Sequence, residues 1–173
     1  MMTSVVVCPL SALDKSIRQH GARAMIAFGG PEAKLDQPKQ IDRTYLALRF
    51  NDINEPRPGL IGPTIDHVAQ IISFAHSWDQ ESPILLQCWM GISRSTAAAA
   101  IILAGLKPTV PAAKIAHSIR QASPSATPNP LMIKHADALL NRAGSLNNAI
   151  ADIGRGENAS EGTQFSISLN SLK

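Results

Sequence analysis

The hydrophobic and polar positions of this chain form two patterns, short continuous apolar runs and longer stretches with helical spacing. Short aliphatic and β-branched runs, bounded by proline, glycine or polar residues, are typical of buried strands. They predict strands at residues 4–8, 24–28, 45–50 and 83–87. A weaker run at 165–169 favours an edge strand near the end of the sequence.

Apolar residues that recur every three or four positions predict helices between these strands. Ser11 and Asn129 are suitable N-caps, and Pro130 directly after Asn129 is a strong helix start. The predicted helices span residues 12–19, 64–78, 96–106, 110–121 and 129–144, with a last helical turn at 149–153. Strands that alternate with helices predict an α/β fold, a mostly parallel sheet of four or five strands with helices on both faces.

The length of 173 residues is enough for one domain with a full hydrophobic core. We expect residues 1–153 to form this domain, and the residues at 154–173, rich in glycine, serine and asparagine, to form a flexible tail. The net charge of +3 and the isoelectric point near 9.1 mildly favour anionic substrates. Because lysine and arginine do not cluster, a nucleic-acid partner is not expected.

Targeting signals are not evident in the sequence. The start of the chain has no basic region followed by an apolar stretch, and no run is long enough to span a membrane. The two cysteines, Cys8 and Cys88, suit a reducing compartment. We therefore expect a cytoplasmic protein without a membrane partner.

The most specific chemistry lies between the predicted strand at 83–87 and the helix at 96–106, in the sequence Cys88-Trp89-Met90-Gly91-Ile92-Ser93-Arg94-Ser95. A helix start has unpaired amides and partial positive charge, so a tight loop leading into it can surround an anion. Gly91 lets the loop curl, and the planar guanidinium of Arg94 matches two oxygens of a tetrahedral oxyanion. Cys88 faces the same positive region, which stabilises its thiolate. A nucleophilic sulfur beneath a phosphate site indicates a phosphatase that forms a phosphocysteine.

This pattern of Cys-x5-Arg followed by serine resembles the signature of the cysteine-dependent protein tyrosine and dual-specificity phosphatases. Cys88, Gly91, Arg94 and Ser95 match the signature position by position, whereas Gln87 stands where the family usually has histidine. The loop at 123–128 and the Asn-Pro helix start after it are similar to those of bacterial members. The resemblance covers residues 4–144, and it implies the α/β fold described above.

A second part of the predicted site lies upstream, where the strand at 45–50 ends. Ligands collect at the carboxyl ends of strands in open α/β sheets, and Asp52 lies there, 36 positions before Cys88. Cleavage of a phosphate ester needs a proton for the departing oxygen, and a nearby loop carboxyl can supply it. Asn51-Asp52 resembles the general-acid loop of the dual-specificity phosphatases. The alternatives are that Asp52 only forms an Asx-turn, or that Glu55 is the acid.

The resemblance implies a role for each residue of the loop. Cys88 is the nucleophile, Asp52 the general acid, and Ser95 a hydroxyl donor to the sulfur when the phosphocysteine is hydrolysed. Arg94 binds the phosphate together with the residues that supply backbone amides, Trp89, Met90, Gly91, Ile92 and Ser93. Because these groups carry the positive charge, no metal or organic cofactor is needed. The implied substrates are phosphorylated proteins or other phosphomonoesters, and phosphate, sulfate or vanadate should occupy the loop.

Two other classes of function remain open. Gln87 in place of histidine favours a binding module that captures phosphorylated ligands and hydrolyses them poorly. A rhodanese-like or arsenate-reductase-like enzyme also uses a loop cysteine and an anion site. A reductase needs a further cysteine close by, and Cys8, in the first predicted strand, is the one candidate.

Overall fold

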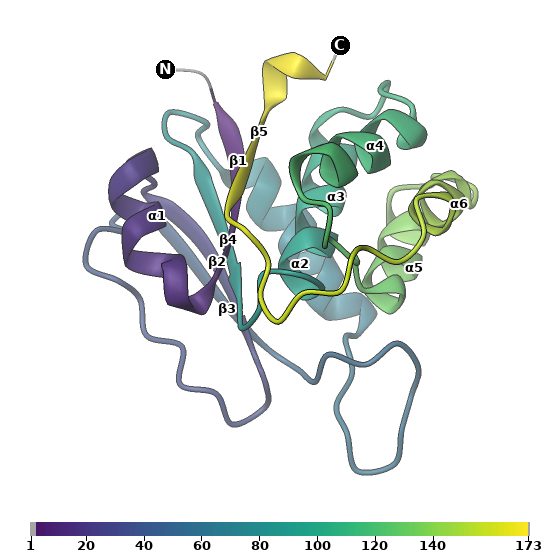
Figure 1. The fold of residues 1–173 in the computed structure, drawn as a ribbon, viewed down its shortest axis with the longest axis horizontal. Helices are drawn as coiled ribbons and strands as arrows, with labels where there is room; N and C mark the ends of the chain where they lie inside the picture. The colour runs from purple at the N-terminus through teal and green to yellow at the C-terminus, as the bar shows by residue number, and fades with distance from the viewer. Residues whose placement is uncertain (1–2, 173) are drawn as a thin grey trace.

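The computed structural model describes residues 3–172 and contains one five-stranded sheet with helices on both faces (Figure 1). The strands are β1 (Ser4–Pro9), β2 (Ala24–Gly29), β3 (Thr44–Arg49), β4 (Ile84–Cys88) and β5 (Phe165–Ser168). Their order is β3-β2-β4-β1-β5, and every pair is parallel except β1 with β5. This confirms the α/β fold and the mostly parallel sheet predicted from the sequence.

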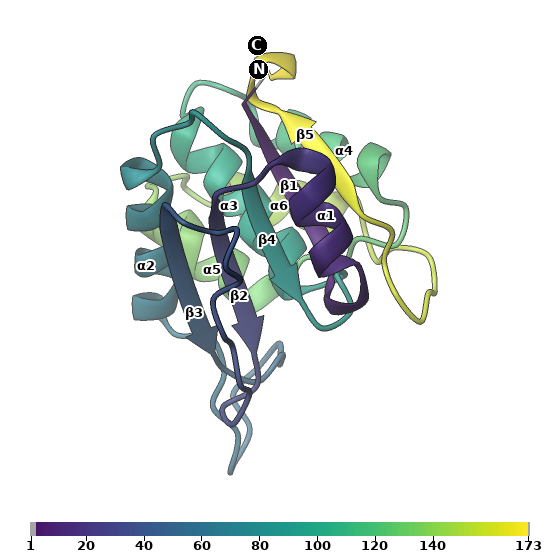
Figure 2. The same ribbon diagram turned by 90° about the vertical axis from the view of Figure 1, so that its left-hand side faces the viewer.

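The helices divide unequally between the two faces of the sheet. Helix α1 (Leu13–His20) covers one face, as Figure 2 shows, and the remaining α-helices lie on the other face. These are α2 (Ile65–Ser77), α3 (Arg94–Leu106), α4 (Ala112–Ala122), α5 (Pro130–Leu139) and α6 (Ser145–Asp152); short 3₁₀ helices span Leu10–Ala12 and Leu169–Ser171. Helix α3 is buried along most of its length, because its alanines allow close packing against the sheet and its neighbours.

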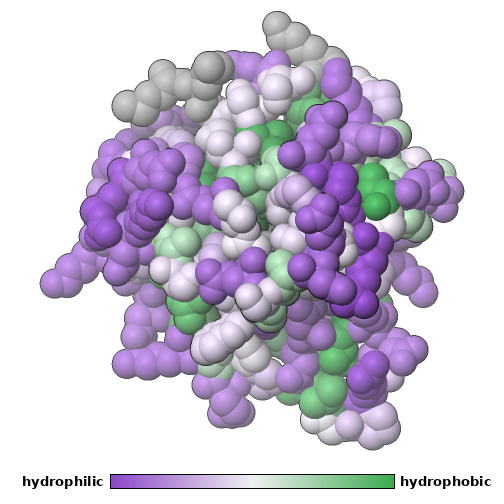
Figure 3. Space-filling view, viewed as in Figure 1, coloured by the Kyte–Doolittle hydropathy of each residue, from purple (hydrophilic) through white to green (hydrophobic). Residues whose placement is uncertain are grey.

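Two apolar clusters pack against the sheet, one on each face. The larger lies between the sheet and helices α2 to α6, and the smaller lies beneath α1. Hydrophilic residues cover most of the face seen in Figure 3, and hydrophobic residues appear there as small separate patches. Strands β1, β2 and β4 are buried on both faces, which explains their continuous apolar runs, whereas the edge strand β3 is mostly half-buried.

The predicted helix at 129–144 ends earlier in the structure, and the helical turn expected at 149–153 belongs to a longer helix, α6. Helix α5 ends at Leu139, and a turn with positive φ at Asn141 and Ala143 leads into α6 at Ser145. The carboxylate of buried Asp137 accepts hydrogen bonds from the amides of Gly144, at 2.6 Å, and Leu146, at 2.8 Å. This side chain caps the second helix from within the first, and the hydrophobic pattern contains no sign of it.

The end of the chain does not form the expected tail. Residues 165–168 are strand β5, which pairs with β1 through the register Val5 to Ile167 and Val7 to Phe165. Phe165 and Ile167 are buried against the larger cluster, and Leu169 continues it. The segment at 154–164 connects α6 to this strand across the molecule (Figure 1). The edge strand expected at 165–169 therefore ties the end of the chain to the sheet.

Candidate active site

The loop at residues 88–95 starts at the carboxyl end of the central strand β4 and runs into α3. Gly91 has φ of +66°, and a Cβ atom there would lie 2.7 Å from the backbone nitrogen of Pro9, at the end of the neighbouring strand. Residues other than glycine would be strained and would collide with β1. The tight curl expected from the sequence is therefore built into the packing between β1 and β4.

The carbonyl groups of this loop are held from outside. The carbonyl of Met90 accepts from the amide of Gly162 at 2.8 Å, and that of Ile92 accepts from the amide of Thr127 at 2.9 Å. The amides of residues 90–93 donate to no other group within the described residues 3–172. A loop with its carbonyls engaged outward and its amides free is suited to an anionic ligand.

Cys88 lies at the start of this loop and contacts the first turn of α3. Its side chain is 2% exposed, and its Sγ lies 3.0 Å from the hydroxyl oxygen of fully buried Ser95. Cys88 also lines a cleft of about 1160 Å³. The structure thus brings together the predicted nucleophile and the predicted hydroxyl donor.

Arg94 extends from the first residue of α3 toward the end of β3. Its Nη1 donates to the carbonyl of Phe50 at 3.0 Å, and its Nε lies 3.8 Å from Oδ2 of Asp52. The Nε is buried and has no hydrogen-bond acceptor, although the side chain lines the cleft. An unpaired buried donor at a cleft indicates a ligand that supplies the acceptor.

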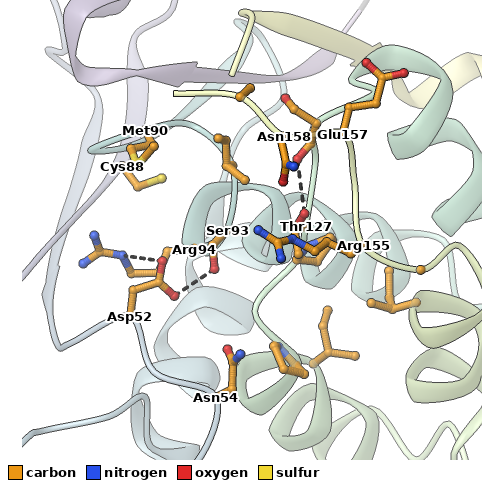
Figure 4. Close-up of a pocket in the computed structure, with 18 of the residues that line it drawn as sticks. Asp52, Asn54, Cys88, Met90, Ser93, Arg94, Thr127, Arg155, Glu157 and Asn158 are labelled. Carbon is orange, nitrogen blue, oxygen red and sulfur yellow. Dashed lines mark hydrogen bonds and ion pairs between the residues drawn. The ribbon is translucent and has the colours of Figure 1, made fainter. Parts of the chain in front are cut away.

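Asp52 lies opposite Ser93, as Figure 4 shows. Its Oδ1 accepts from the hydroxyl of Ser93 at 2.8 Å, and its side chain is 33% exposed in the cleft. The hydrogen bonds of the Asp52 carboxylate run to the distant residues Ser93 and Asn129, and not to the amide two residues on as in an Asx-turn. Asn51 Oδ1 accepts from the amide of Ile61 and closes the loop at 51–61. This loop extends from the end of the sheet where the parallel strands finish (Figure 2).

The chain was compared with known protein families, curated proteins and solved structures. No family model matches the sequence, and no curated protein matches it either. Among solved structures, DUSP15 has 18% identity and a TM-score of 0.60, covering 88% of this chain and 92% of its own. PTPMT1 has 16% identity and a TM-score of 0.57, covering 81% and 94%. The Yvh1 phosphatase domain from Chaetomium thermophilum has 16% identity and a TM-score of 0.55, covering 81% and 92%.

The fold is that of the dual-specificity phosphatases. This confirms, for the fold, the resemblance carried by Cys88, Gly91, Arg94 and Ser95. At such low identities the likeness defines the architecture and leaves the activity to be argued from the site.

Asn129 is a component of this site that the sequence identified only as a helix cap. Its Oδ1 accepts from the amides of Leu131 and Met132, each at 3.0 Å, which caps α5. Its Nδ2 donates to Asp52 Oδ1 at 2.8 Å and to the carbonyl of Ile53 at 3.1 Å. One fully buried amide therefore fixes the start of a helix and the loop that carries the predicted acid.

The other acidic candidate lies elsewhere. Glu55 is exposed, pairs with Arg57 at 3.7 Å, and does not line the cleft that holds Cys88. The geometry therefore favours Asp52 over Glu55 as a proton donor near the sulfur. Trp89, 69% exposed, and Met90, 38% exposed, lie at the rim of the cleft.

Cys8 lies on the other face of the sheet from Cys88. Cys8 packs in the smaller cluster beneath α1, whereas Cys88 belongs to the larger one. Burial raises the pKa of the Cys8 thiol to about 11; a hydrogen bond with Ser16 lowers it in part, and the charge of Cys88 raises it further. This arrangement does not favour Cys8 as the resolving thiol of a reductase.

At residues 3–172, no three or more histidine, cysteine, aspartate or glutamate side chains gather in a way that could hold a metal ion. Across the same residues, none of the helices has both the length and the apolar character needed to cross a bilayer.

Proposed function

We propose that this protein hydrolyses phosphomonoesters through a phosphocysteine intermediate, with phosphotyrosine-type proteins as substrates. The observation that carries the proposal is the arrangement of three residues around one cleft, Cys88, Arg94 and Asp52, with the buried Ser95 hydroxyl 3.0 Å from the sulfur. Met90, Ile92 and Ser93, whose amides have no acceptor within the described residues, line the same cleft. A thiol nucleophile requires a reducing compartment, so the proposal includes a cytoplasmic location.

In the first step the Cys88 thiolate attacks phosphorus and forms the P–S bond while the bond to the leaving oxygen breaks. The amides of the 88–95 loop and the Arg94 guanidinium hold the three remaining oxygens, where charge is spread in the transition state. Asp52 donates its proton to the leaving oxygen, which departs as an alcohol. The Arg94 Nε, buried and unpaired, gains an acceptor when the phosphate binds.

In the second step water attacks the phosphocysteine, and the Asp52 carboxylate takes a proton from it. The P–S bond breaks, inorganic phosphate is released, and the sulfur leaves as a thiolate. The Ser95 hydroxyl, 3.0 Å from Sγ, donates a hydrogen bond to the departing thiolate. The groups that stabilise negative charge in both steps are the loop amides and the Arg94 guanidinium.

The experiment that tests the proposal is turnover of p-nitrophenyl phosphate by the wild-type protein and by Cys88→Ser. Turnover by the wild type, lost in the variant, supports the proposal if vanadate or phosphate still binds to the variant. Wild-type turnover that persists in Cys88→Ser would show that another group is the nucleophile.

The second candidate function is a binding module for phosphorylated ligands. It is favoured by one observation, that buried Gln87 stands directly before the cysteine where the resembled family has histidine. The same assay separates the two functions. A wild-type protein that binds vanadate tightly and turns over no phosphomonoester would be a binding module.

A further inference from the structure

The segment at residues 154–162, here called the strap, runs along the cleft between α6 and strand β5 (Figure 1). Its first end is held by Arg120, whose Nη2 donates to the carbonyl of Gly154 at 2.7 Å. The amide of Gly156 donates to the hydroxyl of Thr127 at 3.1 Å, and the amide of Glu157 donates to the carbonyl of Pro124 at 2.9 Å. The backbone on both sides of residue 155 is therefore fixed.

The second end of the strap is held by the 88–95 loop itself. Besides the bond from the Gly162 amide to Met90, a Cβ atom at Gly162 would lie 2.7 Å from the carbonyl oxygen of Gly91. A Cβ atom at Gly156 would lie 2.5 Å from the backbone of Ser125. The strap thus follows the loops of the site at backbone contact distance and forms one wall of the cleft.

Arg155 is the cationic side chain that the strap brings to this cleft. It lines the cleft together with Cys88 and Arg94, and in Figure 4 its guanidinium points past Thr127 toward Ser93. It forms no hydrogen bond or ion pair with another residue of the described range 3–172. An exposed guanidinium without a partner, on a fixed backbone, is available to an anionic group of a ligand.

The acidic groups that line the cleft do not neutralise Arg155. Asp52 accepts from Ser93 and Asn129 and lies near Arg94. Glu157 lies on the strap, and in Figure 4 its carboxylate points away from the Arg155 guanidinium. The cleft therefore presents a second positive charge besides Arg94.

The volume and lining of the cleft indicate what kind of ligand fits between Arg94 and Arg155. Its volume of about 1160 Å³ is somewhat larger than the roughly 300–1,000 Å³ typical of small-molecule sites. Its apolar lining comes from Pro128, Pro130, Ile133 and Ile150. Such a cleft has room for a phosphotyrosine ring and for neighbouring residues of a peptide.

We propose that Arg155 is a specificity-determining residue that binds the carboxylate of an acidic residue close to the phosphotyrosine in a peptide substrate. The inference rests on the proposed function for the reacting phosphate, which belongs to Arg94 and the 88–95 loop. Arg155 contributes no chemistry to phosphoryl transfer. It selects substrates by binding a second anionic group, which is separate from the reacting phosphate.

The test uses pairs of phosphotyrosine peptides that differ only by glutamate or glutamine at each position flanking the phosphotyrosine. We expect the wild type to favour the glutamate peptide at one or more positions in kcat/KM, and Arg155→Gln to lose roughly three- to tenfold on those peptides. The variant should retain wild-type turnover of the glutamine peptides and of p-nitrophenyl phosphate. Arg155→Lys should retain part of the preference.

Arg18→Gln is the matched control, because it removes the same charge from an exposed position on α1, across the sheet. An equal loss in that variant would assign the preference to overall charge and overturn the inference. Equal turnover of glutamate and glutamine peptides by wild type and Arg155→Gln would also overturn it, while leaving the proposed hydrolysis intact.

A binding arm separates failure of the inference from failure of the proposed function. Fluorescence anisotropy measures the affinity of labelled peptides for Cys88→Ser and for Cys88→Ser with Arg155→Gln. A glutamate preference that Arg155→Gln removes supports the inference even if the wild type turns over no substrate. Absence of that preference in Cys88→Ser, or its persistence in the double variant, counts against Arg155.

Discussion

Residues far apart in the sequence meet at this site through a few short contacts. The sulfur of Cys88 contacts Ser95, and the carboxylate of Asp52 accepts a hydrogen bond from the hydroxyl of Ser93. The resemblance predicted Cys88, Asp52 and Ser95, because it assigns each of them a chemical step, whereas it predicted Ser93 only as the source of a backbone amide. It did not predict how Asp52 is held, because Asn129 lies 77 positions away and its pattern indicates only a helix cap.

At the residue scale, Asp52→Asn tests the predicted general acid. The substitution keeps the shape of the side chain and removes its proton, so kcat should fall by about a hundredfold or more for substrates with poor leaving groups. Esters of more acidic phenols should lose less, because their leaving oxygen needs less protonation. The measurement is kcat across a series of aryl phosphates.

Glu55→Gln is the control for this series, because Glu55 is exposed and lies outside the cleft. It should retain wild-type kcat for every leaving group. If Glu55→Gln loses activity with poor leaving groups and Asp52→Asn does not, the acid has been misassigned.

At the element scale, the structure differs from the sequence-based expectation where polar side chains set the ends of helices. Hydrophobic spacing located the strands and most helices, because burial of one face is a repeating signal. It placed the end of α5 near residue 144 and the start of α6 at residue 149, because it contains no sign of Asp137, which caps α6 by accepting from the amides of Gly144, Leu146 and Asn147. Contacts of this kind depend on the folded geometry, so they leave no periodic trace in the sequence.

Asn129 provides a prediction at this scale, because it joins the start of α5 to the loop that carries Asp52. Asn129→Ala removes the cap, which should cost about 1 kcal/mol of stability, and frees the Asp52 loop. We expect a lower kcat, with the largest loss for poor leaving groups. Urea unfolding and the aryl phosphate series measure the two effects separately.

If Asn129 acts by positioning Asp52, a double variant should show it. In the Asp52→Asn background, Asn129→Ala should cost stability as before and leave the leaving-group dependence unchanged. Independent, additive losses in kcat would mean that Asn129 acts on another part of the site.

At the scale of the whole molecule, the sheet separates two environments for cysteine. The larger cluster and the cleft lie on one face, and Cys8 is buried on the other beneath α1. Cys8 lies in β1, the strand that the sequence predicted at residues 4–8. The sequence predicted the edge strand at 165–169 but not the position of the strap, because the strap is polar and its position depends on β5 pairing with β1.

Because of Cys8, the free energy of unfolding is expected to fall as the pH becomes alkaline. Burial raises its pKa from about 9.0 to about 11, so the unfolded chain loses this proton at lower pH than the folded chain. The contribution of the neutral thiol is fully present below pH 9 and is lost as the pH rises through about 11. The loss is on the order of 2 kcal/mol.

The measurement is the free energy of urea unfolding of wild type and Cys8→Ala between pH 8 and pH 11. Wild type should lose more stability than Cys8→Ala over this range, because the alanine variant lacks the titrating thiol while its other groups are unchanged. Parallel curves for the two proteins would show that Cys8 is not responsible.

The most direct test of the account is to trap the covalent intermediate. Ser95→Ala removes the hydroxyl 3.0 Å from the sulfur and should slow the second step more than the first. After acid quench with p-nitrophenyl phosphate, intact-mass and peptide analysis of Ser95→Ala should find one phosphoryl group on Cys88. It should find none in Ser95→Ala with Cys88→Ser. Steady turnover with no phosphoryl group on Cys88 at any quench time, or with the group on another residue, would contradict the account.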